Sequence, residues 1–477
     1  MYVIVQWMQA PNRGGSSQRE QELERRVESL EQQLARALAE NERLRKQLEE
    51  TLRATKRSAA PFSKGAPKPD PKPPGRKPGS AYGQRATRPV PRRVDEHIPV
   101  PLPPRCPHCQ GPVIRNNTYP QYQEDIVRMT IIRRFDVEVG TCACCGRHAQ
   151  GRHSLQTSDS LNIGEVQVGP EAVSMAAVLN KELGLSHERT ARVLAMGYGL
   201  TWSRSGVCRA LARLGNLAAP TYQQLQQSLR QSPVVWLDDT GWRVGARPQN
   251  LRVLVSEQVT VYVIEPHRGY AEAAAILGED YAGFLVHDGA RCFYGFAQAF
   301  HQSCLEHLIR RCREMIQMTA GAAAQFPSAV KTLLQQSLRL RDRSQRGGEV
   351  SPHGLAVATG RLEAQLDRLL DRRFRCPDNQ RLAKHLRHEQ PHLFTFLRCP
   401  GLHATNNVAE RAIRLMAMAR KTWGGNRTAT GARTQQILAS VLRTCWQQGK
   451  SAFEPLVTLL RSARPLVLEI VPVGPSP

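Results

Sequence analysis

The sequence has 477 residues, with 66 Lys or Arg against 41 Asp or Glu and a formal net charge of +25. The length allows roughly two to four domains, and the charge favours a polyanionic partner, nucleic acid before an anionic membrane surface. No apolar run approaches the roughly 18–20 residues of a membrane-spanning helix, and the start MYVIVQWM does not follow the plan of a signal peptide. Twelve mostly scattered cysteines indicate a reducing cytoplasm rather than a disulfide scaffold.

Residues 19–53 carry a heptad repeat. Its d positions are Leu23, Leu30, Ala37 and Leu44, and its a positions are Val27, Leu34, Asn41 and Leu48. Four heptads of this kind predict a coiled coil, and Asn41 at an a position favours a parallel dimer in one register. A single helix that packs on its own protein is the alternative.

Residues 54–93 form a basic, proline-rich linker. They hold eleven Lys or Arg, nine Pro and one acid, so they cannot bury a core and are expected to be extended and disordered. Within PPGRKPGS, Arg76 and Lys77 lie between prolines and glycines, and basic arms of this kind bind in the DNA minor groove. A purely solvated linker is the alternative.

Two cysteine knuckles, CPHC and CACC, lie in residues 94–160. A four-thiolate zinc site made by Cys106, Cys109, Cys142 and Cys145 is predicted, because each C-x2-C pair closes two corners of a tetrahedron. The segment IVRMTIIRRFDVEV between them alternates as strands do. The alternatives are unligated cysteines, or Cys144 or His108 in place of one of the four.

Residues 165–225 show a helical pattern with short loops. Ser186 is expected to cap a helix, and a second helix after a glycine-containing turn predicts a helix-turn-helix that binds DNA. A helical spacer without DNA contact is an equal alternative.

The following segments predict an α/β core. PVVWLDDTGWRV, NLRVLVSEQ and VTVYVIEPH are expected to be three strands, followed by a helix at 270–278 and a strand at 282–288. This order is similar to a ribonuclease-H-like fold, with its first part at 230–302 and its last part, with tail helices, at 401–462. The Leu- and Arg-rich residues 303–400 would be an all-helical insertion.

Three acids occupy positions that suit two-metal phosphoryl transfer. Asp238 and Asp288 each follow an apolar run and are expected at strand ends, while Glu410 lies in a helical stretch. Carboxylates are the ligands that hard divalent cations prefer, and two such cations clamp the attacking and leaving oxygens of an in-line displacement. Glu306 and Glu389 are competing acids in helical stretches.

Other polar residues lie near Glu410 in the sequence. Asn406 and Asn407 are expected to cap its helix, and Arg414 lies on its face. Phosphate contacts are predicted for Arg411, Arg414, Arg420, Lys421 and Arg427, with Trp423 stacking on a base; a surface helix end with a core Trp is the alternative. Cys304 and His307 lie one helical turn apart, and two ligands alone favour a packed Cys and a hydrogen-bonded His over a second zinc site.

Together these motifs give a resemblance. The chain resembles the insertion-sequence sixty-six family of bacterial DDE transposases, large subunit, from the coiled coil to about residue 462. The matching motifs are KRSAAPFSKG and PGRKPG, the knuckles, DDT at Asp238, DG at Asp288, CLEH at Cys304, NN-x-AER at Asn406, RKTWGGNRT and RTCWQQGKSAFE. Asp239 replaces the usual Glu, and Thr405 stands where many relatives carry Asp; neither is a proposed metal ligand.

The resemblance implies a ribonuclease-H-like core of the retroviral-integrase type, preceded by the coiled coil and a small zinc-binding domain. It implies that Asp238, Asp288 and Glu410 hold two Mg²⁺ or Mn²⁺ ions and that the enzyme binds terminal inverted repeats, cleaves DNA and transfers strands. Expected partners are double-stranded DNA, further copies of the chain as a homodimer or larger oligomer, and other element-encoded proteins, in the bacterial cytoplasm and with no membrane. The alternatives are a nuclease without strand transfer and a catalytically inactive, transposase-derived DNA-binding protein.

Overall fold

The structure, a computed structural model, describes residues 18–56, 90–115, 117–123, 129–156, 167–319, 321–346, 350–462 and 466–470. The chain divides into two units, Met1–Tyr122 and Gln123–Pro477. Most of the basic linker, with Arg76 and Lys77, lies outside the described residues.

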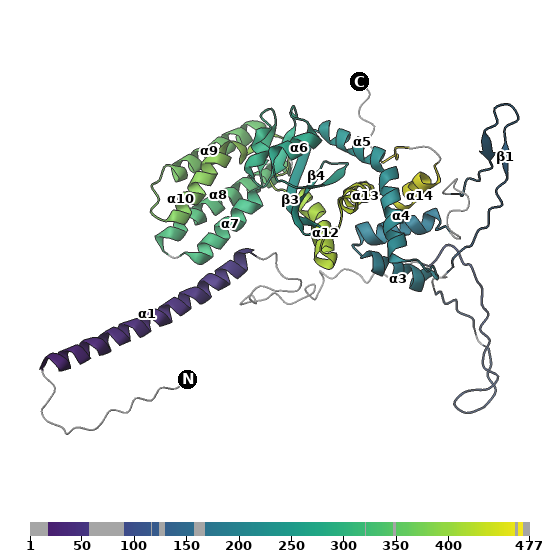
Figure 1. Cartoon of the computed structure of the whole chain (residues 1–477), viewed down its shortest axis with the longest axis horizontal. Coiled ribbons are helices and arrows are strands. Elements are labelled where there is room, and N and C mark those ends of the chain that lie inside the picture. Colours follow the sequence, from purple (N-terminus) through teal and green to yellow (C-terminus); the bar gives the residue numbers. More distant parts are fainter. Residues whose placement is uncertain are drawn as a thin grey trace, which may run out of the picture. The chain divides into compact units, whose positions relative to one another are not determined.

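In the first unit, the heptad segment forms one helix, α1 (Gln18–Lys56), the purple helix in Figure 1. Helix formation is therefore confirmed, with bounds close to those predicted. Val27, Leu30, Leu34 and Leu44 are each more than half exposed. An uncovered apolar stripe of this spacing is what a coiled-coil partner would bury, so dimerisation stays a prediction.

Each cysteine knuckle, taken by itself, folds into the same turn. The amide of Cys106 donates to the carbonyl of Gly111 at 2.9 Å, and that of Cys142 donates to Arg147 at 2.8 Å. Gln110 and Gly146, which follow the second cysteine of each pair, both have positive φ, 61° and 68°. Backbone N–H groups around each turn lower the pKa of the Cys106 and Cys142 thiols, as a metal-binding knuckle requires.

The strands expected between the knuckles are mostly missing. Of the described part of this segment, 129–139, only Val139 lies in a strand, at the start of β1 (Val139–Thr141), which pairs with β2 (His148–Gln150). Residues 129–138 have no strand assignment, and Ile131 and Ile132 are exposed. Alternating apolar residues form a strand only where a sheet face buries them, and none covers these.

Five short helices precede the sheet: α2 (Pro170–Ala177), the π-helical η2 (Val178–Glu182), α3 (His187–Tyr198), α4 (Arg204–Leu217) and α5 (Ala219–Arg230). Ser186 caps α3 as predicted, because its hydroxyl accepts from the amide of Arg189. Gly199, with φ 71°, ends α3. The buried face of α4 packs against α13, described below. Two helices joined by a glycine-containing segment, α3 and α4, are therefore present, and a helix-turn-helix that binds DNA stays a prediction.

One mixed five-stranded sheet forms the core of the second unit, in the order β5-β4-β3-β6-β7. The strands β3 (Val234–Val244), β4 (Arg247–Val255) and β5 (Thr260–Glu265) form an antiparallel meander. After α6 (Tyr270–Leu277), β6 (Phe284–His287) pairs parallel with β3, and β7 (Phe300–Ser303) pairs parallel with β6. The four predicted strands are confirmed, and β7 is an addition, because no strand had been predicted after residue 288.

The two faces of the sheet bury alternate side chains. Val235 and Leu237 face a core completed by α4–α6, α13 and α14, whereas Trp236 and Val253 face a core completed by α7–α12. Figure 1 shows the sheet between these two groups of helices. Successive side chains of a strand point to opposite faces of the sheet, so Asp238, two residues after Trp236, lies on the same face as Trp236.

The remaining elements are helical, as predicted. The insertion contains α7 (Leu305–Met318), α8 (Ala322–Gln345), α9 (Pro352–Leu370), α10 (Pro377–Glu389), the 3₁₀ turn η4 (Gln390–His392) and α11 (Thr395–Arg398). The C-terminal helices are α12 (Asn407–Trp423), α13 (Ala429–Gln447) and α14 (Phe453–Arg461). Among the described helices, none has both the length and the apolar character needed to cross a membrane.

Candidate active site

Asp238 and Asp288 lie on neighbouring parallel strands. Asp288 directly follows β6, as predicted, but Asp238 is not at a strand end: β3 continues to Val244. The parallel ladder with β6 covers only Val234–Trp236 of β3, and from Trp236 onward β3 pairs with β4. Asp238 therefore lies just past the end of the parallel pairing, next to the end of β6, because the hairpin extends β3 beyond its shorter neighbour.

A tight turn fixes Asp288. Its carboxylate accepts from the amide of Ala290 at 3.0 Å, and the amide of Gly289 donates to Nδ1 of His287 at 3.1 Å. Gly289 has a φ of +86°, and a Cβ there would lie 3.1–3.2 Å from the carboxylate of Glu389. Both conditions favour glycine at this position, which explains the Asp-Gly pair in physical terms.

The competing acid Glu389 lies behind this turn. It is fully buried at the end of α10 and accepts hydrogen bonds from the hydroxyls of Tyr294 and Ser303. The other competitor, Glu306, forms an ion pair with Arg313 at 3.0 Å on α7. Both acids are thus held by neighbouring polar groups.

Asn406 joins the start of α12 to β3. Its position before the helix is as predicted, but its side chain makes no cap, which corrects the expected capping role. Its Nδ2 instead donates to the carbonyl of Leu237 at 2.6 Å, and its own carbonyl accepts from the amide of Glu410 at 3.0 Å. Asn406 is fully buried. It therefore ties Glu410 to the residue that precedes Asp238.

The electrostatics bring the three acids into one group. Burial raises the pKa of Asp238 to about 7, against the hydrogen bond from the amide of Asp239, and the negative charges of Asp288, Asp239 and Glu410 raise it further. Repulsion of this kind requires the carboxylates to be close. The negative charges of Asp288 and Glu410 therefore act on Asp238, although the three residues are distant in the sequence.

Asp239 has a different role from Asp238. Its carboxylate pairs with Nε of Arg268 at 2.5 Å, and Arg268 also reaches Asp288 at 3.4 Å. The charge of Glu410 acts on Asp238 but is not among the causes of the raised pKa of Asp239, which burial dominates. This supports Asp238 as the first acid of the group. Arg268, in the loop before α6, was not identified from the sequence, since a lone Arg after a strand carries no pattern.

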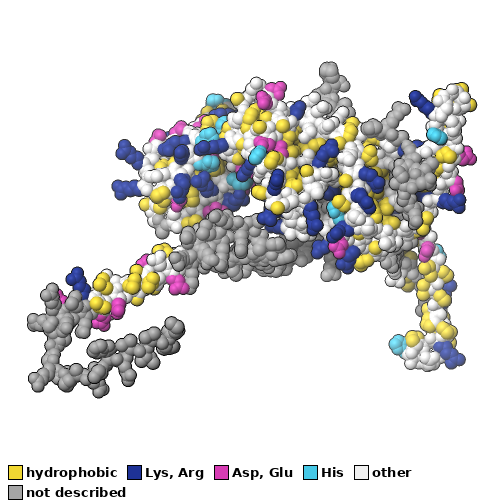
Figure 2. Space-filling view, viewed as in Figure 1, with side chains coloured by type: hydrophobic (Ala, Val, Ile, Leu, Met, Phe, Trp, Pro, Cys, Tyr) yellow, Lys and Arg dark blue, Asp and Glu magenta, His cyan; other side chains and the backbone are white. Residues whose placement is uncertain are grey.

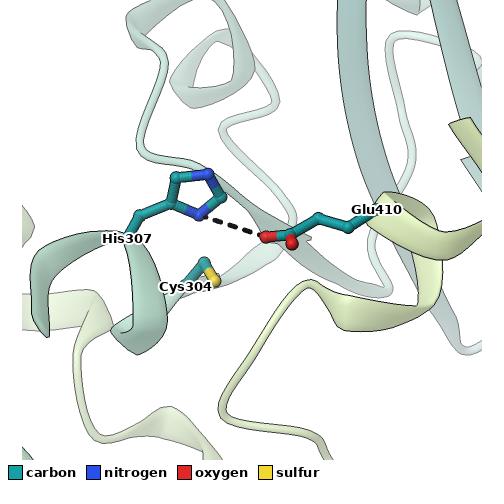
Figure 3. A group of neighbouring side chains, drawn as sticks. All are labelled: Cys304, His307 and Glu410. Carbon is teal, nitrogen blue, oxygen red and sulfur yellow. Dashed lines mark ion pairs between the residues drawn. The ribbon is translucent and has the colours of Figure 1, made fainter. Parts of the chain in front are cut away.

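Glu410 also meets two residues of the insertion. Nδ1 of His307 lies 3.5 Å from Oε1 of Glu410, and Cys304 completes a group whose ligand atoms all lie within 4.8 Å of one another (Figure 3). The sequence showed only Cys304 and His307 together. The third member comes from α12, more than a hundred residues later.

Basic residues surround this part of α12. Arg411, Arg414, Lys421 and Arg427 are exposed, and within the described chain no ion pair engages them. Arg420 is half-buried and donates to the hydroxyl of Thr240 at 3.2 Å. On the face seen in Figure 2, further Lys and Arg side chains gather over the insertion helices.

Trp423 is a packing residue. Its ring meets the buried Trp242 edge to face, with centroids 5.7 Å apart, and Nε1 of Trp242 donates to Asn426 at 2.9 Å. The amide of Asn426 donates to the carbonyl of Arg243. The RKTWGGNRT motif therefore holds the far end of β3. This arrangement matches the alternative of a core Trp rather than a base-stacking ring.

The carboxylate group fits divalent cations. The group offers oxygen ligands. Burial and the neighbouring negative charges disfavour the ionised form of Asp238, and the cation Arg268 reaches Asp288. Oε1 of Glu410 is buried and has no hydrogen-bond partner among the described residues. Carboxylate oxygens are ligands of the kind that hard divalent cations take.

A search for related proteins gives one family. The sequence model described as "Transposase IS66 family" matches residues 165–434, more than half of the chain. A search of curated proteins finds no match.

Proposed function

The chain belongs to the IS66 family of transposases, and from this premise we propose that it cleaves DNA at the ends of a mobile element and joins the 3′ ends to target DNA. The observation that supports this most directly is the convergence of Asp238, Asp288 and Glu410 on one centre. The three residues come from β3, the end of β6 and the start of α12. The remainder of the chain supplies positioning and charge rather than a covalent nucleophile.

The sheet supports a ribonuclease-H-like core of the retroviral-integrase type. Three antiparallel strands followed by two parallel ones, in the order β5-β4-β3-β6-β7, place Asp238 on the central strand and Asp288 on its parallel neighbour. The helices α7–α11 then form an insertion before α12 returns Glu410 to the same face. In this interpretation, residues 230–302 and 401–462 are two parts of one catalytic core.

In this mechanism Asp238, Asp288 and Glu410 would hold Mg²⁺ or Mn²⁺. When bound, such cations lower the pKa of the attacking water or 3′-hydroxyl and offset charge on the leaving oxygen. A cation would stabilise the ionised form of Asp238, which burial and the neighbouring negative charges disfavour. Asn406 fixes the spacing between β3 and α12. Arg268 pairs with both Asp239 and Asp288.

Substrate DNA would be held by exposed cations. Arg411 and Arg414 are placed on the helix of Glu410, and Lys421 and Arg427 follow at its C-terminal end, so together they can contact successive phosphates. Arg76 and Lys77 would contact the minor groove, the knuckles would form a structural zinc domain, and α1 would dimerise. These parts would select and pair the element ends.

The test uses charge-neutral variants of equal volume. Asp238→Asn, Asp288→Asn and Glu410→Gln should each abolish Mg²⁺-dependent cleavage of element-end DNA and joining of a precut end with a free 3′-hydroxyl. Binding to the same DNA should survive, and a double variant should be scarcely worse than a single one, because the three act as a unit.

Glu306→Gln is the matched control. Glu306 lies on α7, half-exposed and paired with Arg313, so its removal should leave cleavage and joining unchanged. Full activity in any of the three variants would contradict the proposal. A wild-type chain that cuts but never joins a precut end would be a nuclease, and one that binds DNA but never cuts would be an inactive derivative.

A further inference from the structure

Cys304, His307 and Glu410 form a ligand set that differs from the three-carboxylate group. Cys304 precedes the first residue of α7, and His307 lies one turn later on the same helix. Glu410 enters from the first turn of α12, and Figure 3 shows the three side chains facing one another. Their ligand atoms all lie within 4.8 Å of one another.

Two of these atoms are buried without a hydrogen bond. Nδ1 of His307 and Oε1 of Glu410 lack any hydrogen bond among the described residues, although they face each other at 3.5 Å. A buried polar atom left unpaired costs about 1–3 kcal/mol, so two in one place require an explanation. Nitrogen and oxygen ligands about 2.0–2.1 Å from a tetrahedral Zn²⁺ would lie about 3.3–3.4 Å apart. The observed separation is close to that value.

The thiol completes the set. Sγ of Cys304 is buried and accepts the amide of Asn406 at 3.2 Å. It also lies at the N-terminus of α7, a helix of 14 residues. Burial raises the pKa of the Cys304 thiol, against the backbone N–H groups of Asn406, His307 and Glu306, which lower it. Sulfur and imidazole ligands select zinc-like cations over Mg²⁺.

We propose that Cys304, His307 and Glu410 bind one zinc-class divalent cation, with a fourth position open to water. The set has the composition of a three-ligand zinc site. The consequence for catalysis rests on the proposed function: an ion held here takes Glu410 from the Mg²⁺ group. Zinc is therefore an inhibitor of the Mg²⁺-dependent reaction, and α7 is the element through which it acts.

The primary experiment counts zinc on the full chain. Chelator-stripped protein is dialysed against buffered free Zn²⁺ and its bound zinc is measured by elemental analysis. To remove the knuckle contribution, all measurements use a Cys106→Ser, Cys142→Ser background, in which about one zinc per chain is expected. Adding His307→Asn should remove it, and Cys208→Ser, at an exposed cysteine on α4, should not. Equal zinc with and without His307 would overturn the proposal.

Two further measurements keep the result clear. His307 is only partly buried, so His307→Asn should unfold at the wild-type temperature in chelator. Should the His307→Asn variant fail to fold, Co²⁺ is added to the background protein and its absorption spectrum is recorded. A thiolate bound to Co²⁺ gives an intense near-ultraviolet band, and absence of that band would overturn the site.

Zinc inhibition is the functional consequence. At fixed Mg²⁺, His307→Asn should tolerate at least about tenfold more zinc before joining is halved; equal sensitivity would overturn the link to Glu410. The zinc count needs neither DNA nor Mg²⁺. A chain that binds the zinc but shows no cleavage in zinc-free buffer with Mg²⁺ would therefore refute the proposed function and leave the metal site standing.

Discussion

Asp238→Asn should make the metal-free protein more stable while removing its activity. The pKa of Asp238 rises from an ordinary value of 3.8 to about 7 in the folded chain, mainly through burial and then through the charges of Asp288, Asp239 and Glu410. Because the pKa is higher in the folded chain than in the unfolded chain, the contribution of Asp238 to the free energy of unfolding is fully present below about pH 3.8. It is lost as the pH rises through 7. Asparagine cannot ionise and avoids this loss.

The magnitude follows from the shift. About three pKa units correspond to about 4 kcal/mol of unfolding free energy above pH 7, to about 2 kcal/mol at pH 5, and to almost nothing at pH 3. The hydrogen bond from the amide of Asp239 can be kept by the asparagine oxygen. At pH 8 the variant should therefore melt on the order of 10 °C above the wild type.

The assay is thermal or urea unfolding of both proteins at pH 5 and pH 8, with and without Mg²⁺. Magnesium at a hundred times its dissociation constant should stabilise the wild type by about 2.7 kcal/mol and the variant much less. Asp280→Asn, at an exposed aspartate, is the control and should change stability by less than about 0.5 kcal/mol. A variant no more stable than the wild type at pH 8, or a gap equal at both pH values, would refute the reasoning.

Two other predictions concern buried polar residues, Asn406 at the candidate site and Lys181 on η2. Asn406→Ala removes the hydrogen bond to the carbonyl of Leu237. It should lower the free energy of unfolding, measured by urea titration, by about 1–3 kcal/mol, and it should reduce joining in a strand-transfer assay. Unchanged joining would show that Asn406 does not position Glu410. Burial lowers the pKa of Lys181 to about 8, so its contribution to stability is lost as the pH falls from 10.5 through 8. Unfolding measurements should show the stability of Lys181→Met relative to wild type falling by about 2–3 kcal/mol between pH 7 and pH 10, and a pH-independent difference would contradict this.

Local pattern was enough for much of this chain. The heptads predicted α1, the cap at Ser186 predicted the start of α3, and apolar runs predicted β3–β6. These features depend on neighbours in the sequence, since capping and periodic burial are local properties. The motifs likewise named the family that the matching sequence model shows.

Predictions from the sequence pattern were wrong where a contact with a distant part of the chain decides the structure. Residues 129–138 of the alternating segment form no strand, whereas Phe300–Ser303, only four residues long, became β7 because β6 offers an edge. Asn406 has the sequence position of a helix cap, yet its side chain reaches the carbonyl of Leu237 instead. In each case a long-range contact decided between two locally possible outcomes.

The sequence by itself determined which acids and cations this protein carries and which of them belong to strands or helices. Only the tertiary structure decided which charges meet. It separated Asp238 from Asp239 by strand parity, engaged Asp239 and Asp288 with Arg268, and brought Glu410 to Cys304 and His307. The reason is that electrostatic energy and metal coordination depend on distances of a few ångströms between groups, which are set by the packing of α7 and α12 around the sheet and not by their spacing along the chain.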